Sequence, residues 1–266
     1  MHRNHHVMEG ELRDVGDAWQ AFKFQWGHTN YTHTEYEGAD AGTRFDNKGH
    51  DFRLEGRQRG IALSNGMQLE GVVGIQNERS HVQSRDDQGA VALLPPSRTQ
   101  STGVFTYQAL KTSWGQVSAA LRSESVVVAS LDNADPTRFP SEEKRFNPRS
   151  VALGALRNFR QGETPTGWQL SSHLSWNQRA PKDYELFANG PHAATGTYEQ
   201  GDRRSAMEKA TQFDLGGAWK DGAHSAGVTG FVTHFDNYLS LQPTGEFKDN
   251  TGTLVNAAAG SPVYQY

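Results

Sequence analysis

The chain has 266 residues, a net charge of −4 and no cysteine. The absence of cysteine excludes disulfides, thiol catalysis and cysteine-ligated metal centres. The slightly negative charge argues against a nucleic-acid binder that relies on phosphate contacts. Only 35% of the residues are hydrophobic, and no apolar run reaches the roughly 18 residues of a membrane-spanning helix. A transmembrane β-barrel tolerates this composition, because only alternate residues of each strand meet lipid.

Segments in which polar and apolar residues alternate recur along the whole chain, which indicates β-strands. Near the N-terminus, Phe22, Phe24 and Trp26 alternate with Lys23 and Gln25. No helical periodicity persists for more than a few residues. The predicted strands cover residues 6–14, 21–36, 44–58, 67–80, 99–111, 115–129, 145–159, 168–177, 208–220 and 225–239, with the beginning of another strand at Val263.

The connections between these strands alternate between short and long. The short ones are predicted at 15–18, 59–66, 112–114, 160–167 and 221–224, and the long ones at 37–43, 81–98, 130–144, 178–207 and 242–262. This alternation predicts an antiparallel up-and-down meander with one rim of tight turns and one rim of long loops. Asp221 and Gly222 form a typical hairpin turn.

Residues 168–177 show the clearest strand pattern. Trp168, Leu170 and Trp176 share one face, whereas Gln169 and His173 belong to an opposite face that has no apolar residue. An apolar strip that carries tryptophan at both ends is typical of a membrane-barrel strand, with lipid outside and a polar lumen inside. A soluble sandwich or propeller would also alternate, but the repeat of about 40–50 residues expected of a propeller is absent.

Two stretches of sequence are more specific than this pattern. Residues 179–190 read Arg-Ala-Pro-Lys-Asp-Tyr-Glu-Leu-Phe-Ala-Asn-Gly, and Pro-His-Ala-Ala-Thr follows at 191–195; residues 28–38 with Gly-Thr-Arg-Phe at 42–45 form the second stretch. The sequence of these two stretches resembles that of barrel strands in TonB-dependent outer-membrane receptors. The zinc- and siderophore-type members, which carry a Gly-Pro-His-Ala-Ala-Thr loop, resemble it most.

The resemblance implies a location in the outer membrane, with lipid around a monomeric barrel. It also implies that residues 1–266 are a partial barrel domain, about 10–11 strands of a larger barrel whose plug domain is missing. The N-terminus lacks a signal-peptide core, and the last residues read as the start of a strand, so we expect an internal fragment. In the family, the TonB–ExbB–ExbD complex acts through the plug, and the barrel passes a metal ion or metal chelate such as zinc, a ferric siderophore or haem.

Histidine and carboxylate residues suggest where such a ligand binds, because zinc accepts both kinds of side chain. His33 and Glu35 share a strand face, and Glu37 joins them if the strand continues. His192 and Glu199 lie in the longest predicted loop, and the resemblance implies that His192 helps to capture metal. Alternatively, these five residues are ordinary polar groups of the rim. The tract His2, His5 and His6 is expected to be a flexible terminus or the remnant of a loop, and such histidine-rich tracts bind metals non-specifically.

No motif of an enzyme is present: the sequence lacks a Gly-x-Ser-x-Gly elbow, a Walker loop and a His-Glu-x-x-His helix. We therefore expect neither catalysis nor a resident cofactor. Arg179 is expected to form structural ion pairs, with Asp183, Glu185, Glu199 and Glu208 as the candidate partners. Two alternatives remain open at this point, a soluble β-rich carbohydrate-binding module that uses exposed tryptophans, and an outer-membrane barrel hydrolase.

Overall fold

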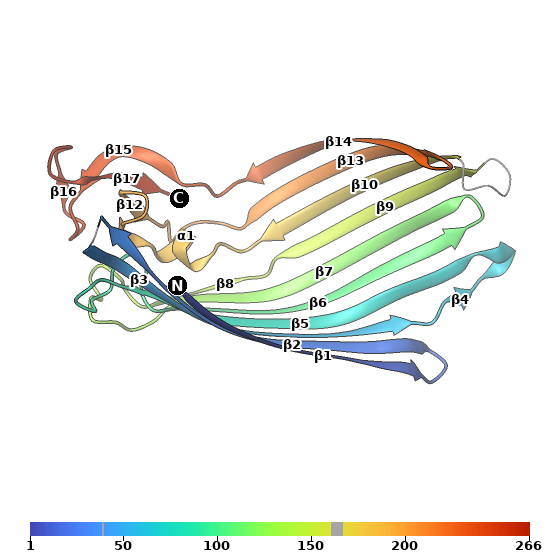
Figure 1. Ribbon diagram of the computed structural model, residues 1–266, viewed down its shortest axis with the longest axis horizontal. Helices are drawn as coiled ribbons and strands as arrows, with labels where there is room; N and C mark the ends of the chain where they lie inside the picture. The colour runs from blue at the N-terminus through green and yellow to red at the C-terminus, as the bar shows by residue number, and fades with distance from the viewer. Residues whose placement is uncertain (39, 161–166) are drawn as a thin grey trace.

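The computed structural model describes residues 1–38, 40–160 and 167–266, and these residues are almost entirely β-structure (Figure 1). Within them, a 12-stranded sheet forms a long wall. Its strands are β1 (His2–Val15), β2 (Trp19–Glu37), β3 (Asp40–Gln58), β4 (Ile61–Ala62), β5 (Gln68–Arg85), β6 (Ser97–Thr112), β7 (Gly115–Ser130), β8 (Glu142–Phe146), β9 (Arg149–Arg160), β10 (Gly167–Arg179), β13 (Glu208–Asp221) and β14 (His224–Asn237). The antiparallel all-β meander predicted from the sequence is confirmed.

A second sheet of five short strands, which we call the rim sheet, lies at one end of the wall (Figure 1). It contains β11 (Asn189–His192), β12 (Thr197–Gln200), β15 (Gln242–Lys248), β16 (Leu254–Val255) and β17 (Ser261–Gln265). The short helix α1 (Asp183–Phe187) lies beside it, and the one-turn 3-10 helix Ser64–Gly66 lies in the connection before β5. No helix of the described residues is long and apolar enough to cross a membrane.

The wall is a curved sheet whose neighbours in space are neighbours in sequence. The path runs β1-β2-β3-β5-β6-β7-β9-β10-β13-β14, with β4 added to β5 and β8 added to β7. In Figure 1, β1 and β14 lie at opposite edges, and the tight turns gather at the end away from the rim sheet. The wall therefore has a short-turn end and a long-loop end, as the alternating connection lengths predict.

Alternate residues of each strand point to opposite faces of the wall. On one face, which we call the outer face, the apolar residues of neighbouring strands lie side by side, for example Phe24 opposite Leu54 and Leu174 opposite Phe213. Leu170 and Leu174 are 45% and 46% exposed, so no second layer covers them. The exposed members of this apolar belt are Met8, Leu12, Phe24, Trp26, Phe52, Leu54, Val73, Ile75, Val104, Val117, Leu121, Val151, Leu153, Phe159, Trp168, Leu170, Leu174, Phe213, Leu215, Val228 and Val232.

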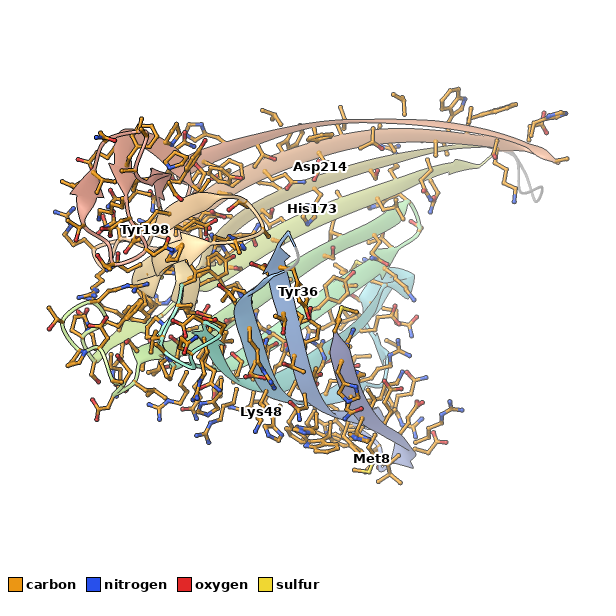
Figure 2. All side chains as sticks on the ribbon, turned by 60° about the vertical axis from the view of Figure 1, so that its left-hand side comes forward. Met8, Tyr36, Lys48, His173, Tyr198 and Asp214 are labelled. Atoms are coloured by element: carbon orange, nitrogen blue, oxygen red, sulfur yellow. The ribbon has the colours of Figure 1, made fainter. Side chains whose placement is uncertain are left out.

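The inner face is mostly polar and carries ion pairs between neighbouring positions. The Arg53 guanidinium contacts Glu55 at 3.0 Å, and His173 Nδ1 lies 3.4 Å from Asp214 Oδ2 on the adjacent strand. Figure 2 shows His173 and Asp214 on neighbouring strands β10 and β13. A continuous exposed apolar face opposite a paired polar face is the arrangement of a barrel wall with lipid outside and a hydrated lumen inside.

Several of the predicted strand and loop boundaries are wrong. The predicted loop 37–43 is a tight hairpin in which Glu37 pairs with Asp40, so β2 and β3 run on past the expected ends. The predicted strand 145–159 is split into β8 and β9 around Pro148, which has no N–H to donate to a ladder. The tract that contains His2, His5 and His6 is not a flexible end but part of β1, paired with β2. Most of the predicted turn 160–167 lies outside the described residues.

The long loop 178–207 contains α1, β11 and β12, and the strand predicted at Val263 is β17. This last strand joins the rim sheet, parallel to β12 and antiparallel to β15, and does not extend the wall. A hydrophobic cluster also lies at the rim, where Leu94, Val128, Leu186 and Phe187 are buried together. The rim is therefore a folded cap with its own core, anchored to β7.

Candidate functional site

The hairpin β11–β12 reaches across the long-loop end from the β10 side of the wall to the hairpin β2–β3. His192 lies at the end of β11, and its Nδ1 is 2.7 Å from Glu199 Oε1 on β12. Its Nε2 is 3.2 Å from Glu35 Oε1, 157 residues away in sequence. The backbone N–H of Ala194 donates to Glu35 Oε2 at 3.3 Å. His192 therefore joins two parts of the rim that come from distant strands of the wall.

His33 completes this cluster on the inner face of β2. Its Nε2 is 3.6 Å from Glu35 Oε1, and its ring stacks on Phe45 with the centroids 4.8 Å apart. Phe45 and His192 form a T-shaped pair, with 6.3 Å between the ring centroids. His33 Nδ1 is buried and has no hydrogen-bond partner in the described structure. We call His33, Glu35, His192 and Glu199 the rim cluster.

The two carboxylates of the rim cluster favour the protonated form of His192. The side chains of Glu35 and Glu199 are only 14% and 10% exposed. The hydrogen bond to Glu199 is the main cause that raises the pKa of His192 above its ordinary value of 6.5, and Glu35 adds to the effect while burial opposes it. A charged imidazolium that bonds to two carboxylates holds the β11–β12 hairpin against β2.

This pKa shift predicts that the rim loosens as the pH rises. Because folding raises the pKa of His192, its contribution is complete below the unfolded pKa of about 6.5 and is lost as the pH rises through the higher folded value. We expect a loss on the order of 1 kcal/mol in the local stability of β11–β12. Hydrogen exchange of residues 189–200, corrected for its intrinsic pH dependence, should show this loss, and His192→Gln should remove the pH dependence. Equal protection of the two proteins at every pH would contradict the assignment.

Four of the five predicted metal ligands therefore come together, although they lie in two widely separated segments. The fifth, Glu37, ends β2 two residues beyond Glu35, and its side chain lies outside what the structure describes. Among the described residues, no group of three or more His, Asp or Glu side chains is arranged to hold a metal ion. The cluster is a chain of hydrogen bonds, so a metal ion would have to displace the proton of His192 before it could bind there.

A cleft of about 380 Å³ opens beside the rim cluster, with His192 in its wall. Asp86, Asp87 and Arg138 line it as well. The carboxylate of Asp86 accepts the backbone N–H groups of Gln88 and Ala90, which is a turn-capping role. The cleft thus offers a ligand an imidazole, two carboxylates and a guanidinium from three different segments of the chain.

Arg138 is the residue of the site that the sequence reasoning missed. Its Nε donates to the Asn189 carbonyl oxygen at 2.6 Å, and its guanidinium also donates to the carbonyls of Ala92 and Asn250. One side chain therefore ties the β7–β8 loop to three other rim segments. Because all three acceptors are backbone carbonyls, residue types in the sequence carry no signal for this role.

The ion pairs around Arg179 are structural, as predicted, but only two of the four expected partners take part. Arg179 bonds to both oxygens of Glu185, at 2.8 and 3.0 Å, and to Glu208 at 3.1 Å. Glu199 pairs with His192 instead. Asp183 accepts the N–H of Tyr184, and burial raises the pKa of this carboxyl. The ion pairs of Arg179 lie at the base of the long loop 178–207, where β10 ends and β13 begins.

Comparison with known proteins supports the same architecture. The family model for the β-barrel of TonB-dependent receptor-like proteins matches residues 4–265. Among solved structures, the copper transporter OprC is similar, with a TM-score of 0.72 and 15% identity over 99% of this chain and 42% of that chain. A double mutant of the Serratia marcescens hemophore receptor HasR, in complex with its hemophore HasA and heme, also has a TM-score of 0.72, with 13% identity over 99% and 43% of the two chains.

The siderophore receptor PirA from Pseudomonas aeruginosa is similar too, with a TM-score of 0.53 and 16% identity over 99% of this chain and 50% of that chain. The chain thus spans between 42% and 50% of the length of these three structures. At identities this low, the likeness to the solved structures shows the fold alone.

Proposed function

This chain belongs to the TonB-dependent receptor β-barrel family, and we propose that it forms part of the barrel wall and rim of a receptor that captures a nutrient at the cell surface. The family consists of outer-membrane transporters of Gram-negative bacteria, so the chain is an outer-membrane protein and not an enzyme. This membership replaces both alternatives left open by the sequence, the carbohydrate-binding module and the barrel hydrolase.

The proposal assigns the two ends of the wall to the two sides of the membrane. In outer-membrane barrels the short turns face the periplasm and the long loops face the exterior. The rim cluster and its cleft then lie at the cell surface, at the mouth of the lumen. The edge strands β1 and β14 each pair on one side only within the described residues. We propose that further strands complete the barrel and that a plug couples the receptor to the TonB–ExbB–ExbD complex.

We further propose that the ligand is a metal ion or a metal chelate, and that His192 takes part in its capture. The observation that carries this proposal is the meeting of His192 with Glu199 and Glu35, at 2.7 and 3.2 Å, beside an open cleft. Imidazole and carboxylate together suit divalent transition metals. His33 is within reach as a further nitrogen ligand, and its Nδ1 has no partner in the described structure. Because binding must displace a proton, uptake should weaken in acid.

Titration of zinc and of copper into the receptor purified from outer membranes tests the role of His192. We expect His192→Gln to weaken binding of the preferred ion by about 10-fold or more, because a ligand and its link to Glu35 are both lost. The matched control is His234→Gln, which changes an exposed histidine paired with Asp236 on β14 and should leave the affinity unchanged. Equal affinity of wild type and His192→Gln would refute the site. Binding of a ferric siderophore or haem, with no binding of either ion, would refute direct ion capture but not the receptor.

A further inference from the structure

A band of basic and imidazole side chains lies on the outer face, immediately beyond the apolar belt on the long-loop side. The last apolar row across the strands places Trp26 opposite Phe52. The next two rows of cross-strand partners, which we call the basic rows, join His6, His28, His50 and Arg79, and then Lys48, His81 and Arg98. On each strand these positions are an even number of residues from the members of the belt, so their side chains share its face.

The basic rows form one contiguous surface. His28 stacks between its neighbours, with its ring centroid 6.3 Å from that of His6 and 4.4 Å from that of His50. Arg79 Nε donates to His81 Nε2 at 3.2 Å, so His81 acts as a neutral acceptor in this arrangement. Within the described residues, Arg79 thus contacts an imidazole and forms no ion pair with a carboxylate.

The carboxylates of the protein do not neutralise all the positive charges of the basic rows. Within the described residues, Arg79 and Lys48 form no ion pair, and Arg98 reaches Glu143 only at 3.4 Å. Glu143 is shared with Arg145, which it contacts at 2.6 Å. Arg98 Nε and His28 Nδ1 are buried without a hydrogen-bond partner in the described part of the chain. A buried donor such as Arg98 Nε–H is costly unless an acceptor is supplied.

A groove runs over the second of the basic rows. Its volume is about 260 Å³, and Lys48, His81 and Ser97 are among the residues that line it. The only carboxylate in its lining, within the described residues, is Asp46, which already contacts Arg44 at 3.3 Å. The groove therefore presents donors to any group that bears several acceptor oxygens.

We propose that the basic rows and this groove bind the phosphate groups of an anionic glycolipid in the outer leaflet of the membrane. The long-loop end faces the exterior, so the rows lie at the level of the lipid headgroups, directly above the hydrocarbon in contact with Trp26 and Phe52. Lysine and arginine at this level attract anionic headgroups, and guanidinium groups match phosphate oxygens geometrically. Acyl chains of the same lipid would lie along the apolar belt, which a soluble phosphate cannot use.

The test compares receptor purified from outer membranes with a variant that carries Lys48→Gln, Arg79→Gln and Arg98→Gln. The matched control carries Arg13→Gln, Arg157→Gln and Lys220→Gln, which remove three cationic side chains near the short-turn end. Each protein is stripped of lipid in detergent and titrated with a glycolipid that bears phosphates on its sugar headgroup, with the same lipid after phosphatase treatment, and with inorganic phosphate. Native mass spectrometry counts the bound lipid, and the thermal unfolding midpoint without lipid verifies folding.

We expect wild type and control to retain the phosphorylated glycolipid, and the triple variant to bind it about 10-fold or more weakly. The dephosphorylated lipid and inorganic phosphate should bind no protein appreciably. The single variant Lys48→Gln, at an exposed position, should show a smaller loss and keeps the test decisive if the triple variant does not fold. Equal retention by the basic-row variants and the control would overturn the proposal, as would equal binding of the dephosphorylated lipid. Saturable binding of inorganic phosphate that displaces the lipid would show a soluble-anion site instead.

Discussion

Replacing Leu174 by arginine should lower the free energy of unfolding of the membrane-inserted receptor by about 2–4 kcal/mol, the cost of a cation on the lipid face of a barrel near the bilayer midplane. Leu174 lies in the middle of β10, with Leu153 and Phe213 beside it in the apolar belt. A charge there cannot reach water or a partner without distortion of the wall. Equilibrium unfolding in guanidinium chloride, with the protein in phospholipid vesicles, measures the loss.

The adjacent residue provides the matched control. His173 occupies the same strand but the inner face, where it lies 3.4 Å from Asp214. His173→Arg keeps a cation beside that carboxylate in a hydrated environment, so we expect a change within about 0.5 kcal/mol. A loss that is equal for the two substitutions would show that both faces meet the same surroundings, which the barrel-wall account does not allow.

The second large effect is expected at Arg179. Its side chain is 35% exposed, but it holds Glu185, whose side chain is only 5% exposed, through two hydrogen bonds. Arg179→Met should cost about 2–3 kcal/mol, below the 3–5 kcal/mol of a fully buried pair because solvent screens part of the interaction. The free energy of unfolding of the variant reports the loss.

Two further variants separate this ion pair from a general effect of losing an arginine. The double variant Arg179→Met, Glu185→Gln should recover part of the stability, because no buried carboxylate is then left without its partner. Arg204→Met removes an arginine with a highly exposed side chain, whose partner is Asp202, and should be close to neutral. The structural role would be contradicted if Arg204→Met lowered the free energy of unfolding as much as Arg179→Met does. It would also be contradicted if the double variant were less stable than Arg179→Met.

The wall of the barrel was predictable because its determinants are local. Period-two alternation such as that from Trp168 to Trp176 specifies which residues share a face, and turn residues such as Asp221 and Gly222 specify where strands reverse. The short and long connections follow from the same pattern. The resemblance of residues 179–195 to the receptor family then selected a membrane barrel among the sheet proteins that this alternation allows.

The details of the rim were less predictable because they depend on contacts between distant segments. Nothing in the sequence indicates that His192 meets Glu35 across 157 residues, or that Arg138 binds three backbone carbonyls. The strand at Val263 was recognised, but its partners β12 and β15 were not. Likewise, the basic rows draw one or two residues from each of several strands, so they become visible only once the register is known.

Site-directed spin labelling tests the orientation of the wall most directly, and the cysteine-free sequence allows a single labelled cysteine at any position. Labels at Leu174→Cys and His173→Cys are compared for collisions with oxygen, which concentrates in lipid, and with a water-soluble nickel chelate. We predict that the Leu174 label is accessible to oxygen and protected from nickel, and that the His173 label shows the reverse. A nickel-accessible label at Leu174 together with an oxygen-accessible label at His173 would contradict a lipid-facing apolar belt.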